Sequence, residues 1–170
     1  IKTRFKNLNF ESINFSSKNN FSFKINNKFK LKDLSINSII EIDQSKYRKP
    51  KILNNIFTDM ADVINLKDHK INITYNKDNL SLKGSGKIKL ENEFDEINYV
   101  INNKKSDFEF ISNINLSELS IINNKFTKNF FPNTNDKINL KNHKIKISYK
   151  NNSLSFEGLG KIQIEKKFDQ

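Results

Sequence analysis

Apolar and polar residues alternate along most of this chain with a period of two. The clearest run has Ile71, Ile73 and Tyr75 alternating with Asn72 and Thr74. Successive side chains of a β-strand point to opposite faces, so this alternation predicts strands with one apolar face and one polar face. The same pattern recurs on both sides of this run, and the sequence therefore predicts an all-β fold.

The apolar positions also predict how neighbouring strands meet. A one-residue slip would move a strand's apolar side chains to the opposite face, so strand pairings that keep every apolar set on one side are favoured. They predict an up-and-down antiparallel meander of about five strands per repeat. The predicted pairings are Tyr75 with Leu80, Ile73 with Leu82, Leu90 with Ile97, Ile88 with Tyr99, Ile101 with Phe108, Leu116 with Leu119, and Ile114 with Ile121.

The chain contains an internal repeat. Residues 64–96 and 138–170 align without gaps at an offset of 74, with 18 identities in 33 positions. Self-similarity of this kind indicates that one structural unit occurs at least twice. A weaker similarity at an offset of 85 relates Phe23, Ile25, Phe29, Leu31, Leu34 and Ile36 to Phe108, Phe110, Ile114, Leu116, Leu119 and Ile121.

This repeat predicts the organisation of the chain. Residues 1–63 form a partial or diverged first repeat with an insertion, and a 3.6-residue apolar period after Pro50 predicts one short helix over about 51–63. Residues 64–137 form a repeat unit, and residues 138–170 form the start of the next. The first copy continues into a further strand where the second stops, so we expect a piece of a longer, continuous β protein.

All four glycines lie within the two repeated segments. They are Gly84 and Gly86 in the first copy and Gly158 and Gly160 in the second. Glycine inside a strand marks a bend or a close approach by another group. We expect these pairs to be points where the sheet bends, with space left for a ligand on the apolar face as the alternative.

An extended sheet must hide its apolar face. The chain is 35% hydrophobic, below the typical share for globular domains, which argues against a thick two-sided core. The sheet could fold on itself as a sandwich, or curl into an open hydrophobic groove. We favour the groove, with this lining: Phe23, Ile25, Phe29, Leu31, Ile71, Ile73, Tyr75, Leu80, Leu82, Ile88, Leu90, Ile97, Tyr99, Ile101, Phe108, Phe110, Ile114, Leu116, Ile145, Ile147, Tyr149, Leu154, Phe156, Ile162 and Ile164.

The charge of the chain changes this picture little. The net charge is +11 and comes almost entirely from lysine, because Arg4 and Arg48 are the only arginines. Such a charge can serve nucleic acid or anionic lipid headgroups, but nucleic-acid sites favour arginine for bidentate contacts. Lysine, asparagine, isoleucine and phenylalanine are also abundant together, as AT-rich coding would produce. We expect no nucleic-acid partner.

The sequence offers no combination of residues for catalysis. His69 and His143 are the same position in two repeats, which indicates a structural role, and the chain has no cysteine. The segment Lys83–Lys87 lacks the spacing of a phosphate loop. Asp95 and Glu96 are read as recurring loop residues rather than a catalytic pair. We expect no enzymatic activity, no cofactor and no metal site.

Two motifs resemble those of AsmA-like bacterial envelope proteins, closest to the YhdP and TamB branch. One is Gly-Xaa-Gly-Lys-Ile over 84–88 followed by Phe-Asp-Xaa-Ile-Xaa-Tyr over 94–99. The other combines Phe131 and Pro132 with Ile138–His143. The similarity covers roughly residues 20–170, although the anchor helix and the C-terminal end of such proteins have no counterpart in this sequence.

That resemblance implies a function as well as a fold. AsmA-like proteins are anchored in the inner membrane of Gram-negative bacteria and cross the periplasm. They form a repeating β-groove that shields phospholipid acyl chains on the way to the outer membrane. The resemblance therefore implies a segment of a lipid-transport bridge. The alternative is a closed β-sandwich binding or adhesin-type module, in which the apolar face is only core.

Overall fold

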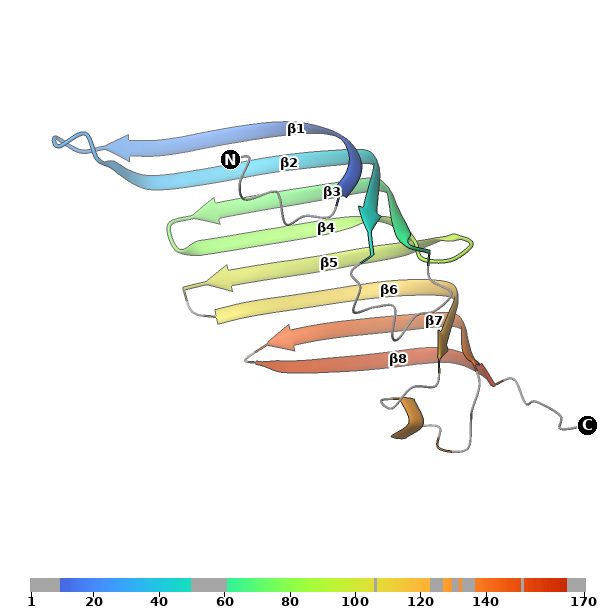
Figure 1. Ribbon diagram of the computed structural model, residues 1–170. Coiled ribbons are helices and arrows are strands. Elements are labelled where there is room, and N and C mark those ends of the chain that lie inside the picture. Colours follow the sequence, from blue (N-terminus) through green and yellow to red (C-terminus); the bar gives the residue numbers. More distant parts are fainter. Residues whose placement is uncertain are drawn as a thin grey trace, which may run out of the picture.

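The computed structural model describes residues 10–49, 61–105, 107–122, 127–129, 132, 137–150 and 152–164. Eight antiparallel strands form one sheet in which every strand pairs with its neighbours in the chain, in the order β1 to β8 (Figure 1). The strands are β1 (Phe10–Ile25), β2 (Leu31–Arg48), β3 (Val63–Asn76), β4 (Asn79–Lys89), β5 (Phe94–Lys104), β6 (Asp107–Ile122), β7 (Lys137–Lys150) and β8 (Ser153–Ile164). The predicted all-β, open meander is confirmed.

The sheet is not flat. One end of the long strands turns sharply to one side, so the sheet curls like a trough (Figure 1). The buried apolar residues gather on the inner side of this turn, where Ile64, Leu90, Leu116 and Leu119 form a cluster. Partly buried side chains surround the cluster, among them Tyr47, Leu66 and Leu140. The chain therefore builds its small core in the crook of the bend.

Several predicted pairings agree with the structure and others are displaced. Tyr75 lies opposite Leu80, and Ile73 lies opposite Leu82, as expected. The next two hairpins are each shifted by two residues. Ile97 lies opposite Gly86, and Ile101 lies opposite Phe110. A two-residue shift keeps the apolar side chains on the same face, so the predicted facing of these strands holds.

The predicted hairpin between Leu116 and Leu119 is wrong. Both residues lie on β6, which runs unbroken from Asp107 to Ile122. One 74-residue repeat therefore contributes four strands, β3 to β6, rather than five. The weaker similarity at an offset of 85 is not structural either, because its first members lie on two strands, β1 and β2, and its second members lie on one.

The predicted helix over about 51–63 falls mainly outside the described residues. Only its last part is described, and there Val63 opens β3 as a strand residue. Among the described residues the one helical element is a 3-10 turn at Thr127–Asn129, labelled η2.

Candidate functional site

The apolar side chains form continuous rows across the sheet, perpendicular to the strands. Residues directly opposite one another in neighbouring strands project from the same face. One row crosses six strands without a polar member: Ile73, Leu82, Ile101, Phe110, Tyr149 and Leu154. Its neighbours include the shorter row Ile97, Ile114 and Ile145. Because the buried cluster lies on this same face, the apolar face is the inner face of the trough.

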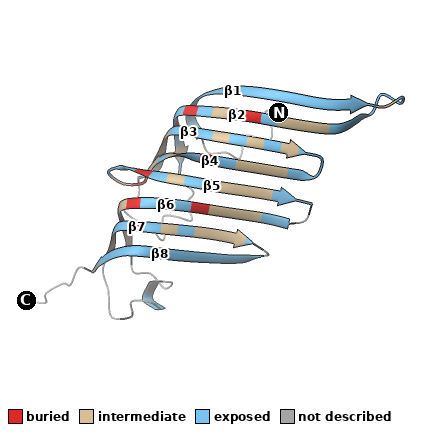
Figure 2. Cartoon of the chain, turned by 180° about the vertical axis from the view of Figure 1, so that it is seen from behind, coloured by how far each residue is buried: buried red, intermediate tan, exposed pale blue. Residues whose placement is uncertain are grey.

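This inner face stays largely open. Among the described residues no second layer covers it, and only six apolar residues are buried. Apolar side chains of β3 to β7 are mostly half-buried, whereas those of the edge strands are exposed (Figure 2). Phe156 on β8 is 60% exposed and Phe21 on β1 is 62% exposed. Exposed apolar surface of this extent marks a binding surface more often than it occurs by chance.

The structure places nearly all the predicted lining residues on this face. Phe29 is the exception, because it lies in the turn between β1 and β2 and is 92% exposed. Leu90 lies just beyond β4 and belongs to the buried cluster. Ile164 ends β8, and its side chain lies outside the described ones.

Sequence reasoning missed part of the face on β1 and β2. Phe15 and Phe21 on β1 face Ile42 and Ile36 on β2, and these continue into the rows of β3. The apolar spacing was present in the sequence, but polar residues interrupt it. They include Asn19 and Ser38, which lie opposite each other on the same face and are joined by a side-chain hydrogen bond.

Aromatic rings lie on the strand glycines. In β4, a Cβ atom added to Gly84 would overlap the ring of Tyr99, and one added to Gly86 would lie 2.8 Å from Cα of His69 and overlap its ring. The two rings neighbour each other, with centroids 6.3 Å apart. Close approach by a side chain is thus the reason that both positions carry glycine.

His69 is the most buried ionisable ring on this face. It is 4% exposed, and its Nε2 lies 3.0 Å from the carbonyl oxygen of Lys87, which makes that nitrogen the proton donor. Burial lowers the pKa of His69 below its ordinary value, although the Lys87 carbonyl and the charge of Asp68 act in the opposite direction. Burial likewise raises the pKa of Tyr99. The pair therefore stays uncharged near neutral pH, as an apolar face requires.

The second copy repeats half of this arrangement. His143 lies on Gly160, where an added Cβ would overlap its ring and lie 2.7 Å from its Cα. Gly158 is the counterpart of Gly84, yet the nearest atom to an added Cβ there is Cδ2 of His143, at 4.0 Å. No ring covers Gly158 because Tyr99 belongs to β5, and β8 has no described strand on its other side.

A repeated backbone irregularity forms the bend beside the histidines. Asp68 and Asn142 hold positive φ angles of 53° and 51°, values that aspartate and asparagine tolerate better than most residues. At each position the register with the next strand shifts by one residue, which defines a β-bulge. Bulges increase local strand bending, and these two lie opposite the glycines that carry the histidine rings.

Carboxylates satisfy backbone groups near the bend. The N–H of Ser117 donates to Oδ1 of Asp95 at 2.7 Å, and the N–H of Ser120 donates to Oε1 of Glu91 at 2.6 Å. Asp95 was expected in a loop, but it lies on β5 and is 4% exposed. Its role is thus structural, because it binds a part of β6 that has turned away from the β5 ladder.

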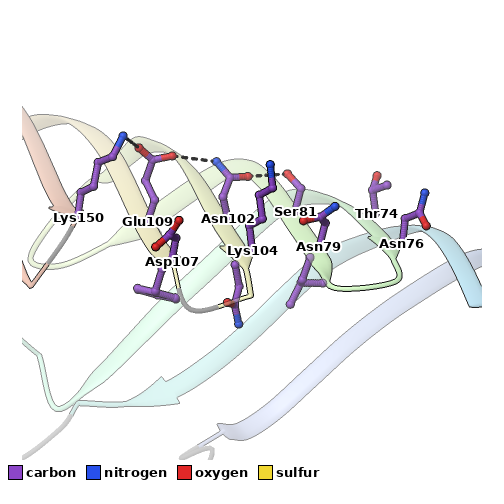
Figure 3. A pocket seen from close by; sticks show the side chains of 12 residues that line it. Thr74, Asn76, Asn79, Ser81, Asn102, Lys104, Asp107, Glu109 and Lys150 are labelled. Atoms are coloured by element: carbon purple, nitrogen blue, oxygen red, sulfur yellow. Dashed lines mark hydrogen bonds and ion pairs between the residues drawn. The ribbon is translucent and has the colours of Figure 1, made fainter.

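The outer face is polar and cross-linked between strands. Figure 3 shows a chain of side-chain contacts from Ser81 through Asn102 and Glu109 to Lys150, each on a different strand. It borders a shallow depression of about 450 Å³ at the turn end of the sheet. The hydrogen bond from Asn102 and the contact with Lys150 hold the pKa of Glu109 below its ordinary value. These groups satisfy one another, so the depression offers no catalytic arrangement.

No protein family, curated protein or solved structure matches this chain. Among the described residues, no group of three or more histidine, cysteine or acidic side chains could hold a metal ion. Nor is any helix within the described part of the chain long and apolar enough to cross a membrane. The assignment of function therefore rests on the geometry of the apolar face.

Proposed function

We propose that the inner face of the trough binds phospholipid acyl chains, as a segment of a bridge that carries lipid between the inner and outer membranes of a Gram-negative bacterium. The observation that carries the proposal is the uncovered face with its unbroken apolar rows. Such a surface suits acyl chains, because dispersion and hydrophobic contact need no fixed side-chain geometry.

The dimensions of the sheet agree with this function. Eight strands at a spacing of about 4.8 Å give a face about 34 Å across the strands. The rows run in that same direction, so a chain lying along a row crosses strand after strand on one kind of surface. Transport needs weak contact everywhere, and we therefore expect no single side chain to be essential.

The closed-sandwich alternative differs from the arrangement of the described residues, which form a single layer. The two functions predict opposite effects for an inward charge. In a closed core, a buried unpaired carboxylate would unfold the protein. On an open face the carboxylate stays hydrated, and the cost is the lost contact of one partly buried side chain, about 1–2 kcal/mol for Leu82→Asp.

The test is native mass spectrometry with lipid extraction on protein purified from a bacterial host. We expect wild-type protein to carry phospholipid, and Phe156→Asp and Leu82→Asp to lose most of it while keeping β-type circular dichroism. Ser155→Asp and Asn72→Asp are matched controls, because both residues are exposed on the outer face beside the altered positions. Wild-type protein without lipid, or inward variants that retain it, would count against the proposal.

The cellular setting needs its own measurement. Fractionation of the source cells, followed by immunodetection of the native protein, should find it in the envelope. Detection in the cytoplasm alone would rule out the bridge, even if the purified protein binds lipid.

A further inference from the structure

The exposed edge of β8 differs from that of β1. β8 is regular from Ser153 to Ile164, with inward residues that carry no charge: Leu154, Phe156, Gly158, Gly160 and Ile162. Sheet edges are commonly protected by bulges, prolines or inward charges, and β8 has none of these among its described residues. β1 pairs irregularly with β2 at three places and places Ser17 and Asn19 on the inner face. β8 is therefore the edge better suited to receive another strand.

The repeat shows what such a strand must look like. In the first copy, the edge of β4 is occupied by β5, with Gly84 opposite Tyr99 and Gly86 opposite Ile97. β8 is the counterpart of β4 at an offset of 74 and preserves both glycines. Glycine is unfavourable within a strand, and at Gly84 the ring of Tyr99 accounts for it, whereas at Gly158 no ring is present.

We propose that the edge of β8 binds an antiparallel strand with the side-chain pattern of β5, supplied by a partner, whose aromatic ring covers Gly158. In this pairing the aromatic residue lies opposite Gly158, and apolar residues two positions away on either side lie opposite Phe156 and Gly160. Main-chain hydrogen bonds along the edge would supply affinity, and the ring on the glycine would fix the register. The inference does not depend on lipid binding.

The probe is a fluorescently labelled peptide of residues 94–104, the segment that occupies this place on β4. Fluorescence anisotropy with the full chain should show saturable binding. Changing Tyr99 to alanine in the peptide should weaken binding at least tenfold, because the ring would be lost. A peptide of the same composition in scrambled order should not bind.

The matched protein variant is Gly158→Val. Its side chain has free space in the unbound protein and valine favours strands, so thermal stability should not fall. It occupies the position of the incoming ring, and we expect binding of the peptide to weaken at least tenfold. Ser155→Val, on the outer face of the same strand, should leave binding unchanged. Equal affinity of Gly158→Val and wild-type protein would overturn the proposal, as would the absence of saturable binding.

Disulfide trapping tests the register without background, because the chain has no cysteine. Ser81 lies opposite Asn102 in the first copy, so Ser155→Cys should cross-link to a peptide carrying Asn102→Cys. A peptide carrying Asn98→Cys would place its thiol four residues away, about 13 Å, and should not react. Cross-linking to both peptides alike would contradict the predicted register.

Analytical ultracentrifugation separates this proposal from self-association. If the β8 edge is instead occupied by β1 of a second copy, the chain alone should form oligomers that Gly158→Val disrupts, and the peptide should not bind until they dissociate. That result would replace the proposed partner strand. A monomeric chain that binds the peptide supports the proposal.

Discussion

Glycine at three strand positions makes room for a ring that lies against the backbone. We expect Gly84→Ala to lower the free energy of unfolding by about 1–3 kcal/mol, because the methyl group would overlap Tyr99 in a packed site. Gly158→Ala should have no such cost, since its added Cβ has 4.0 Å of clearance. Urea unfolding of the two variants, followed by circular dichroism, measures the difference.

A double-mutant cycle provides the control. In a Tyr99→Ala background the obstacle is gone, so Gly84→Ala should cost much less than it does alone. If Gly84→Ala is equally harmful with and without the ring, the glycine serves backbone conformation and not the close approach of Tyr99.

The buried histidine predicts how stability depends on pH. Burial places the folded-state pKa of His69 below its ordinary value of 6.5, so the unfolded chain binds more protons between the two pKa values. The free energy of unfolding should therefore rise with pH in that window. The contribution is fully present above about pH 6.5 and is lost as the pH falls.

Urea unfolding at several values between pH 5 and pH 8 measures this dependence. His69→Gln keeps a group that can donate to the Lys87 carbonyl but does not titrate, and it should flatten the curve. Parallel curves for the variant and the wild type would show that His69 does not contribute.

At the level of single residues, sequence reasoning recognised structural roles better than it recognised contacts. The equivalence of His69 and His143 indicated a structural histidine, and the structure places both rings on glycines. The covering of Gly84 by Tyr99 could not be predicted, because the two residues were assigned a register two positions away from the observed one. Alternation alone cannot distinguish registers that differ by two residues, since both keep the same face inward.

Among the elements, the bulge beside the bend is the feature most open to a test. We expect Asp68→Val to destabilise the protein by about 1–2 kcal/mol, because a β-branched residue is poorly tolerated at a φ angle of 53°. Asp68→Gly should be nearly neutral at that position. Lys70→Val, two residues along on the outer face, is the control in ordinary strand geometry. Thermal unfolding of the three variants should rank them in that way.

The same irregularity explains the wrong hairpin. Leu116 and Leu119 are three residues apart, and that break in the two-residue period was interpreted as a turn. In β6 the break instead spans two consecutive positions, Ser117 and Glu118, after which the alternation resumes on the same strand. β7 contains a matching break at its bulge. A bulge and a tight turn both disturb the period in sequence, and only pairing with the next strand separates them.

For the whole molecule, an uncovered face has a calorimetric signature. Apolar surface that is already hydrated in the folded state adds nothing to the heat capacity of unfolding. A typical protein of 170 residues would show about 2.0–2.6 kcal/mol/K. We expect a clearly lower value for lipid-free protein, by scanning calorimetry at several pH values. A typical value would mean that the inner face is covered in solution.

The open face itself was predictable from the amount of apolar sequence, because the chain has enough for one side of a sheet and too little for two. What closes or extends the sheet at its edges was not predictable, since unpaired strand edges have no compositional signal of their own.

The repeat also makes the length of this protein adjustable in whole steps. The aliphatic residue opposite His69 is Ile42 on β2, and the one opposite His143 is Leu116 on β6, so the two strands present equivalent partners. Deleting residues 64–137 would join β2 to β7 with the same facing, and the bulges would remain aligned along the bend. Evolution can thus lengthen or shorten such a trough by one unit of four strands, about 19 Å, without altering its cross-section. Insertions of any other length would break the seam of the bend.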